Sequence, residues 1–167
     1  MKQLTLIRHA KSSWKHPELA DFDRPLNKRG KKDLPDMTER IYQSNLHPDL
    51  LLSSGARRAV TTANAVASRL KLKPEQFQII PELYESSSET LLYTLQNLPD
   101  KLTHVMLVGH NPGLEMLIHF LTQNQLEKFP TAAVFSMHLS IAQWAELAEG
   151  CATPILFDYP KKHLTAT

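Results

Sequence analysis

The sequence predicts an α/β fold, a three-layer sandwich in which helices cover both faces of a mostly parallel central sheet. Short apolar segments typical of strands alternate along the chain with longer segments whose apolar residues recur at helical spacing. Most strand segments are unbroken apolar runs, as in strands buried on both faces. With 167 residues, 42% hydrophobic and 22% charged, the chain is expected to form one domain over residues 1–167.

The first half of the chain supplies two strands and two helices. A strand is expected at residues 4–7, directly before a charged loop that continues to Pro25. Asn27 can cap a helix over residues 28–45 because its side chain can accept a hydrogen bond from the first turn. The next strand is expected at residues 49–53.

Residues 56–70 carry alanines and larger apolar side chains at helical spacing, and Pro74 follows soon after, so this segment is predicted to be a helix. The rest of the chain continues the alternation. Strands are expected at residues 77–80, 104–108, 133–141 and 155–159, and helices at 89–98 and 115–122. Trp144, near the connection between the last two strands, is expected in the core. Ligands of such sheets bind at the carboxyl ends of the strands.

The charge balance and the cysteine count exclude several functional classes. Lys and Arg total 19 against 17 Asp and Glu, so no global charge predicts nucleic acid or an anionic membrane as partner. A single cysteine, Cys151, excludes an intrachain disulfide framework and a Cys-x-x-Cys zinc site. The first apolar run is too short for a signal peptide. We therefore expect a cytoplasmic protein without a membrane anchor.

Two predicted strands end in a histidine beside a cationic or turn-forming residue. His9 directly follows Arg8, and His110 lies in a Gly-His-Asn-Pro segment. If these strands are neighbours, their histidines share one pocket at the carboxyl edge of the sheet. Arg57 and Arg58, after the strand at 49–53, bring guanidinium groups to the same edge. Paired arginine hydrogen bonds suit the tetrahedral oxygens of a phosphoryl group.

Four segments of the chain resemble the histidine phosphatase superfamily, which has the phosphoglycerate mutase-like fold. They are residues 6–12 (Leu-Ile-Arg-His-Ala-Lys-Ser), 23–30, 54–63 (Ser-Gly-Ala-Arg-Arg-Ala-Val-Thr-Thr-Ala) and 107–113 (Leu-Val-Gly-His-Asn-Pro-Gly). The second segment is similar to that of the short SixA-type phosphohistidine phosphatases. The four motifs occur in the family's order and spacing and span most of the chain, so together they are specific.

The resemblance implies a role for each matching residue. His9 would be the nucleophile and would form a phosphohistidine intermediate that water then hydrolyses. Arg8, Arg58 and His110, with Asn111, would bind the phosphoryl oxygens. No metal ion and no cofactor is implied.

Two assignments within the resemblance need a choice between neighbours. Counting back from the Thr-Ala pair at 62–63 places Arg58, rather than Arg57, at the family's arginine position. The family's general acid falls on Glu85, in Leu-Tyr-Glu, and Glu82 is the second choice. The SixA-type branch is where this acid is least fixed.

Three positions depart from the family pattern without touching a catalytic group. Ala10 and Ala132 stand where relatives often have glycine, and Gly55 stands where they have proline. These departures affect backbone geometry rather than chemistry.

The resulting prediction is a phosphatase that acts on a phosphohistidine-containing protein or a small phosphorylated substrate. The alternatives are a phosphomonoesterase or mutase acting on small molecules, and a module that only binds phosphorylated partners. Between Glu85 and Val105 there is room for about one helix and no long insertion that could form a lid. A purely binding module would have little need of His9.

Overall fold

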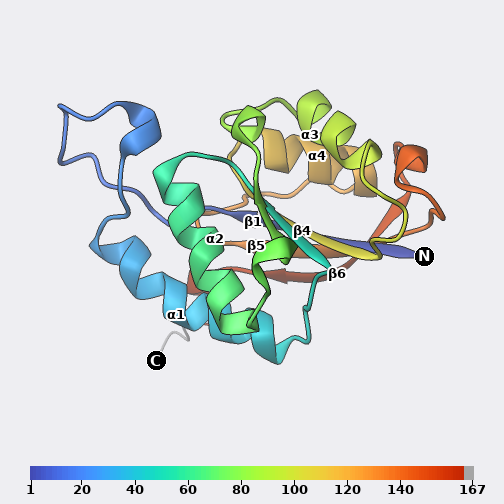
Figure 1. The fold of residues 1–167 in the computed structure, drawn as a ribbon, viewed down its shortest axis with the longest axis horizontal. Coiled ribbons are helices and arrows are strands. Elements are labelled where there is room, and N and C mark those ends of the chain that lie inside the picture. Colours follow the sequence, from blue (N-terminus) through green and yellow to red (C-terminus); the bar gives the residue numbers. More distant parts are fainter. Residues whose placement is uncertain (164–167) are drawn as a thin grey trace.

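The protein, described over residues 1–163 by a computed structural model, has the predicted α/β fold (Figure 1). The sheet contains β1 (Lys2–Arg8), β2 (Leu50–Ser53), β3 (Phe77–Ile79), β4 (His104–Gly109), β5 (Val134–Leu139) and β6 (Ala152–Asp158). Their order across the sheet is β3-β2-β4-β1-β5-β6. β3, β2, β4 and β1 are mutually parallel, and β5 runs antiparallel to both of its neighbours. The sheet is therefore mostly parallel, as predicted.

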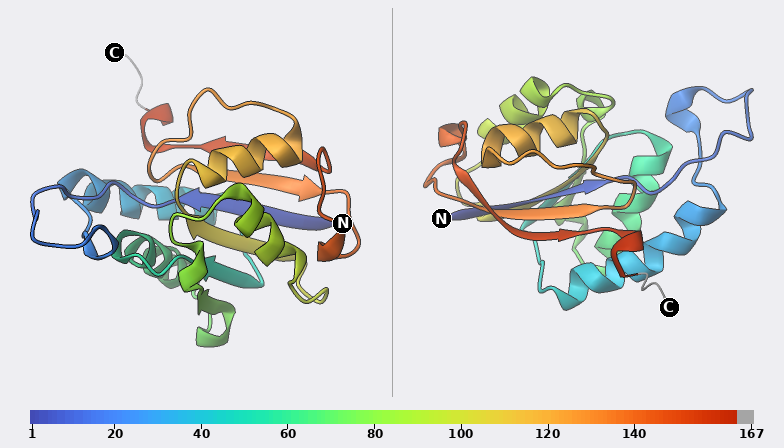
Figure 2. Two further views of the ribbon diagram at one scale, coloured as in Figure 1. Left: turned by 90° about the horizontal axis from the view of Figure 1, so that it is seen from above. Right: turned by 180° about the vertical axis from the view of Figure 1, so that it is seen from behind.

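Helices cover both faces of the sheet (Figure 2). α1 (Lys28–Gln43) and α2 (Arg57–Leu70) lie together on one face, and α3 (Ser88–Gln96) and α4 (Gly113–Thr122) lie together on the other. Short 3-10 helices occupy the connections at Asp21–Asp23, Pro74–Gln76, Pro81–Leu83, Trp144–Glu146 and Pro160–His163. This arrangement is the three-layer sandwich expected from the sequence.

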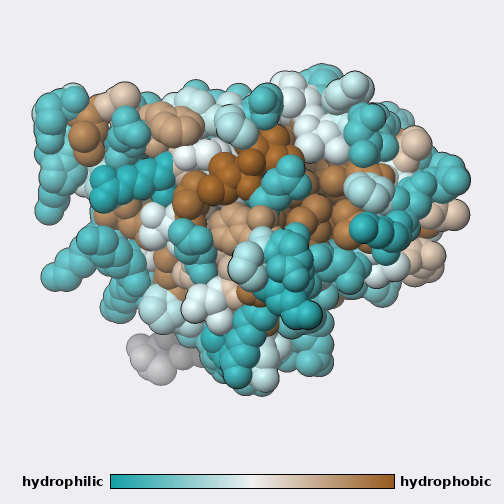
Figure 3. All heavy atoms as spheres, in the orientation of Figure 1, coloured by the Kyte–Doolittle hydropathy of each residue, from teal (hydrophilic) through white to brown (hydrophobic). Residues whose placement is uncertain are grey.

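The strands bury side chains on both faces because neighbouring residues point to opposite sides. Leu6 and Leu107 belong to one hydrophobic cluster, whereas Ile7 and Val108 belong to the other. Trp144 is fully buried in the first cluster, as expected. In the orientation of Figure 1, hydrophobic residues gather in the middle of the surface and hydrophilic residues surround them (Figure 3). Among residues 1–163, each helix is too short or too polar to span a bilayer.

The observed ends of the elements differ from the predicted ones by a few residues. β6 begins at Ala152 rather than residue 155 and so contains Pro154. β6 lies at the edge of the sheet, where a missing N–H is tolerated, and the register with β5 shifts between Ser136 and Met137. α4 begins at Gly113, two residues before the predicted start.

The segment from residue 10 to residue 27 projects beyond the carboxyl ends of the parallel strands (Figures 1 and 2). At its end Asn27 caps α1, as predicted, by accepting a hydrogen bond from Gly30 N at 2.8 Å. Gly30 packs so tightly against the segment that a Cβ atom there would lie 2.2 Å from the carbonyl oxygen of Lys11. α1 therefore presses directly on the chain that leaves β1.

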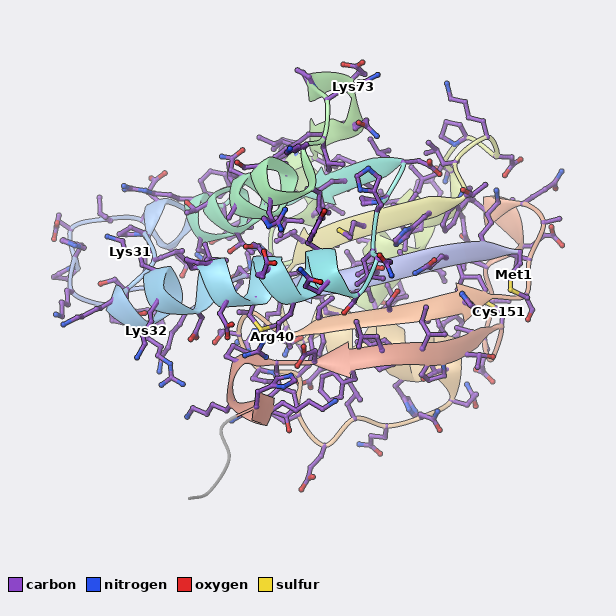
Figure 4. All side chains as sticks on the ribbon, turned by 90° about the horizontal axis from the view of Figure 1, so that it is seen from below. Met1, Lys31, Lys32, Arg40, Lys73 and Cys151 are labelled. Carbon is purple, nitrogen blue, oxygen red and sulfur yellow. The ribbon has the colours of Figure 1, made fainter. Side chains whose placement is uncertain are left out.

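α1 is also joined to the end of β6. Nη1 of Arg40 donates hydrogen bonds to Asp158 Oδ1 at 3.3 Å and to the carbonyl oxygen of Tyr159 at 3.1 Å. Figure 4 shows Arg40 on α1 beside this part of the chain, and Lys31 and Lys32 nearer the start of the helix. Both lysines are exposed to solvent.

Candidate active site

The two motif histidines lie side by side because their strands are neighbours. β1 and β4 pair in parallel with Arg8 opposite Gly109. One residue further, the backbone N–H of His9 donates to the carbonyl oxygen of Gly109 at 3.2 Å. The ring centroids of His9 and His110 are 5.1 Å apart. The sheet topology thus brings both histidines into one pocket, as the sequence predicted.

The His9 ring is held in one orientation and is uncharged. Its Nδ1 lies 2.8 Å from the carbonyl oxygen of Ala10, which can only accept, so Nδ1 carries the proton and Nε2 keeps a free lone pair. Burial lowers the pKa of His9 to about 3, and the nearby His110, Arg58 and Arg8 lower it further. The hydrogen bond to the Ala10 carbonyl raises this pKa but does not offset the burial. The side chain is 7% exposed. At neutral pH, Nε2 is therefore an available nucleophile.

Thr62 joins the chain after His9 to the helix that carries Arg58. Its hydroxyl accepts a hydrogen bond from Ala10 N at 2.9 Å and donates one to the carbonyl oxygen of Arg58 at 2.8 Å. The family motif predicted Thr62 only as a marker of register. In the structure it fixes the start of α2 relative to His9.

Arg58 lies in the pocket, whereas Arg57 points to solvent. The Arg58 side chain is 4% exposed, and Arg57 is exposed. This difference follows from the helix period, because adjacent residues of α2 face directions about 100° apart. The geometry matches the register that was anchored on Thr62.

Asp21 holds Arg58 in place. Arg58 Nη1 donates to the backbone carbonyl of Asp21 at 2.8 Å, and Nη2 donates to its Oδ2 at 3.0 Å. Tyr84 Oη also donates to Oδ2, and Arg24 Nε donates to Oδ1 at 3.0 Å. Burial alone would raise the pKa of Asp21, but the hydrogen bonds from Tyr84, Arg58 and Arg24 bring it down to about 2. Asp21 is thus an anion inside a cationic pocket.

The second histidine, His110, is held by Ser54. The Ser54 hydroxyl accepts from Ala56 N at 3.2 Å and lies 2.7 Å from His110 Nε2. Because a hydroxyl can donate or accept, this contact fits both tautomers of the neutral ring, and in the tautomer with its proton on Nδ1 that N–H is available to a ligand. Burial lowers the pKa of His110 to about 4, and the positive charge of Arg58 is the second-largest cause of this shift. His110 is therefore neutral at physiological pH.

Several polar atoms of this region are buried without a partner among the described residues. They are Arg8 Nε, Arg58 Nε, His110 Nδ1 and Asn111 Oδ1. An unpaired buried polar atom is costly and uncommon. Here all of them belong to residues that line one cavity.

The side-chain amide of Asn111 donates both of its hydrogens to groups within the protein. Its amide nitrogen donates to the carbonyl oxygen of Phe129 at 2.9 Å and to Glu115 Oε1 at 3.1 Å. Arg8 Nη1 donates to the same Phe129 carbonyl at 3.1 Å. In this arrangement Asn111 has no amide hydrogen left for a phosphoryl oxygen, and it orients Phe129 beside Arg8.

The cavity at the carboxyl edge of the sheet has a volume of about 350 Å³. The residues that line it come from six separate parts of the chain and include His9, Arg8, Arg58, His110, Asn111, Glu85, Asp21, Arg24, Lys11, Ser12, Trp14 and Thr131. Trp14, 79% exposed, stacks its ring on the guanidinium of Arg24 at 3.6 Å. All the sequence-predicted site residues thus meet in one open cavity. Residues 1–163 contain no group of three or more His, Cys, Asp or Glu side chains placed to bind a metal ion.

The two candidate acids lie in different places. Glu85 lines the cavity, and its Oε1 is 3.9 Å from Arg58 Nη2. Its side chain is 60% exposed, and its backbone adopts φ +48°, a left-handed conformation uncommon for glutamate. Glu82 is exposed in the 3-10 helix at Pro81–Leu83 and does not line the cavity. Of the two, only Glu85 lines the cavity that contains His9, Arg58 and His110.

Sequence reasoning missed Asp21, Tyr84 and Ser54 as parts of the site. Asp21 and Tyr84 lie in or next to short 3-10 helices, and no spacing relates them to the histidines. Ser54 could have been found, because it directly follows the strand that precedes Arg58. Ala132, where relatives often have glycine, adopts φ +63°, so the backbone keeps the left-handed conformation without glycine.

Comparison with known proteins agrees with this geometry. The family model described as histidine phosphatase superfamily (branch 1) matches residues 4–94. An uncharacterized chloroplastic protein of Arabidopsis thaliana is 32% identical over 123 residues, covering 68% of this chain but only 56% of that protein. An uncharacterized protein of Mycobacterium tuberculosis is 28% identical over 167 residues, covering 93% of this chain and 100% of its own.

A solved structure has the same fold. The crystal structure of a protein assigned as the phosphohistidine phosphatase SixA of Agrobacterium tumefaciens superimposes with a TM-score of 0.82 at 28% identity, covering 95% of this chain and 98% of that one. The family match and this likeness together support phosphatase activity. The segment that matches the family model contains the Arg-His pair of β1 and the arginine of α2, and these residues meet in one pocket. This chain belongs to the histidine phosphatase superfamily.

Proposed function

We propose that this protein is a phosphohistidine phosphatase of the SixA type, which removes a phosphoryl group from a histidine on a protein by way of its own phosphorylated His9. The observation that carries the proposal is the state of His9. Its ring is buried and neutral, its Nδ1 is bound to the Ala10 carbonyl, and its Nε2 is free in a cavity lined by arginines. A histidine in this state is prepared to attack phosphorus.

In the first step, Nε2 of His9 attacks the phosphorus atom, and the bond from phosphorus to the leaving group breaks. Negative charge is spread over the three equatorial oxygens in this transition state. The guanidinium groups of Arg8 and Arg58 and the N–H of His110 stabilise that charge by donated hydrogen bonds. In the second step, water attacks the phosphohistidine, its proton is lost to solvent, and inorganic phosphate leaves with His9 again neutral.

The leaving group distinguishes the possible substrates. An alkoxide leaves slowly unless an acid protonates it, whereas the imidazole of a phosphohistidine is readily protonated from solvent. Glu85 is the candidate acid, but its side chain is 60% exposed and its Oε1 lies 3.9 Å from Arg58 Nη2, so it is not enclosed beside the leaving group. A site without an enclosed proton donor favours a substrate with a labile phosphorus–nitrogen bond.

A small-molecule phosphomonoesterase is the second candidate. α3 is the one helix between Glu85 and β4, so this part of the chain adds no insertion over the cavity. An uncovered cavity can admit a histidine on a protein surface. A module that binds phosphorylated partners without catalysis is the third candidate. Such a module does not need a nucleophile, so the free lone pair on Nε2 of His9 favours an enzyme over it.

The test is a phosphate-release screen with the purified protein. We expect turnover of a phosphohistidine-containing protein to exceed that of sugar and nucleotide phosphates, to survive dialysis against a chelator, and to be inhibited by vanadate, which mimics the pentacoordinate phosphoryl group. Faster turnover of a small ester would favour the phosphomonoesterase, and a requirement for added magnesium or manganese would contradict the metal-independent mechanism.

The nucleophile is tested in the same preparation by rapid quench with labelled substrate. The parent protein should give an acid-labile, base-stable phosphoenzyme, and His9→Ala should give none. His110→Ala is the matched control, because it removes the neighbouring imidazole but leaves Nε2 of His9, so labelling should be slower but still present. Label on the His9→Ala protein would show that another residue is the nucleophile.

A further inference from the structure

A second cavity adjoins the candidate active site. It has a volume of about 340 Å³ and shares Arg8, Lys11 and Thr131 with the active-site cavity. Its other lining residues are Arg29, Asp33, Lys128, Pro130, Tyr159, Pro160 and Lys161. The second cavity therefore lies directly beside the candidate active site, with Arg8 in the wall of both.

The charge of this second cavity is strongly unbalanced. Five of its lining residues are cationic, and one, Asp33, is acidic. Asp33 lies 3.5 Å from Arg29, and within residues 1–163 no carboxylate lies within 4.0 Å of the side-chain nitrogens of the other four cations. Like charges held together repel one another and attract an anion. The cavity is thus complementary to a negatively charged group.

The fold holds the walls of the second cavity in place. The carbonyl oxygen of Lys11 accepts a hydrogen bond from Asn27 N at 3.0 Å, and the chain there is pressed against Gly30. On the opposite side, Arg40 binds the carbonyl oxygen of Tyr159 directly before Pro160. The backbone at Lys11 and the backbone leading to Lys161 are therefore held by contacts within the protein, which lowers the entropic cost of binding.

We propose that the second cavity is an anion subsite that binds a second negatively charged group, a carboxylate or a phosphate, on the same substrate whose phosphoryl group reacts at His9. Arg8 lines both cavities, so the two anionic groups lie on either side of its guanidinium. The proposal rests on the proposed phosphatase function and narrows its substrates to those with two anionic groups. The second group is either part of a small ester or an acidic side chain beside a phosphohistidine.

The experiment compares substrates that differ only in the second charge. Phenyl phosphate is compared with 3-carboxyphenyl phosphate, and a phosphohistidine peptide with flanking Asp and Glu is compared with the same peptide carrying Asn and Gln. We expect kcat/KM to be on the order of tenfold higher for the doubly anionic member of at least one pair. The pair that responds identifies whether the second anion belongs to a small molecule or to a protein. Equal values within both pairs would overturn the proposal.

Two double variants show whether the second cavity is responsible. Lys128→Ala with Lys161→Ala removes two cations from its wall and should abolish the preference while leaving the singly anionic substrates unchanged. Lys31→Ala with Lys32→Ala removes the same charge from the exposed face of α1 (Figure 4), outside the lining of this cavity, and should keep the preference. Equal loss in both double variants would mean that only the overall charge matters, and would contradict the subsite.

Binding to the His9→Ala protein separates this inference from the proposed function. Calorimetry with the two phenyl phosphates should show tighter binding of the carboxylated compound, and that difference should disappear in Lys128→Ala with Lys161→Ala. If the parent hydrolyses none of the substrates but this difference is found, the phosphatase function fails and the subsite stands. If the parent is active but the affinities are equal, the subsite fails alone.

Discussion

Asp21 accepts a hydrogen bond from Arg58 at 3.0 Å, so the buried arginine of the candidate active site is paired with a carboxylate before any phosphoryl group arrives. The bond to the backbone carbonyl of Asp21, at 2.8 Å, is independent of that carboxylate. The protein therefore orients Arg58 twice, once with an anion that repels the substrate and once with a neutral oxygen that does not.

Replacing the anion by a neutral amide should tighten phosphate binding. In Asp21→Asn, the backbone bond to Arg58 is kept while a negative charge close to the bound phosphate is lost. For a partly exposed carboxylate whose field is screened by water, such a charge is worth about 1 kcal/mol, or roughly fivefold in affinity. We expect inorganic phosphate to inhibit the variant several-fold more strongly than the parent, as measured by its inhibition constant. Weaker inhibition would show that the carboxylate acts mainly by orienting Arg58.

The adjacent arginines should differ in their effect on catalysis. Arg58→Ala removes a buried, oriented donor, and such a loss typically lowers the rate by about 100-fold. Arg57→Ala removes an exposed side chain that starts the same helix and should change kcat/KM by less than about twofold. Both are measured on one aryl phosphate. Similar losses in the two variants would place Arg57 in the phosphoryl site as well.

The role of Glu85 can be tested by substrates with leaving groups of different basicity. Glu85→Gln should slow alkyl phosphate hydrolysis most, nitrophenyl phosphate less and phosphohistidine least, because only a poor leaving group needs an acid. The measured quantity is the ratio of variant to parent rate on each substrate. Glu82→Gln is the matched control and should leave all the ratios near one. A uniform loss in Glu85→Gln would mean that Glu85 shapes the cavity without donating a proton.

Stability should fall on acidification before most carboxylates titrate. Burial lowers the pKa of His9 to about 3 and the pKa values of His104 and His110 to about 4, from the ordinary 6.5. Between pH 6.5 and about 4 the unfolded chain binds protons that the folded protein does not, so the free energy of unfolding decreases as the pH falls. Each such histidine contributes a slope of up to about 1.4 kcal/mol per pH unit.

Urea denaturation between pH 7.5 and 4.5 measures this slope. His104→Gln removes one buried histidine far from the phosphoryl site and should make the dependence shallower. The exposed His119→Gln is the control and should leave the slope unchanged. An unchanged slope in His104→Gln would show that this ring is protonated in the folded protein.

The sequence alone predicted the main strands and helices and six of the residues that meet in the cavity, namely Arg8, His9, Arg58, Glu85, His110 and Asn111. This was possible because strand burial, helix period and motif spacing are local properties of the chain. The prediction that His9 and His110 lie close together also assumed that their strands are adjacent. The pairing of β1 with β4 confirms this assumption. The antiparallel β5 and the order of the strands followed from no local signal.

The residues that sequence reasoning missed are placed by loops. Asp21 reaches Arg58 across 37 positions of the chain and Tyr84 across 63, and neither contact has a period or a motif. The anion subsite is of the same kind, because its lysines come from the chain after β1, the chain before β5 and the chain after β6. Such arrangements depend on how loops pack, which a single sequence does not encode in any regular pattern.

Gly30 illustrates how a distant helix position limits the freedom of the reacting atom. With the Lys11 carbonyl 2.2 Å from where a Cβ would lie, the backbone of α1 is in direct contact with the chain two residues after His9. A backbone contact of this kind cannot be relieved by rotating a side chain. A methyl group at position 30 would therefore push the backbone at Lys11 away from α1. That shift would reach His9 through two peptide units, so the position of the nucleophile depends on a residue that does not contact the substrate.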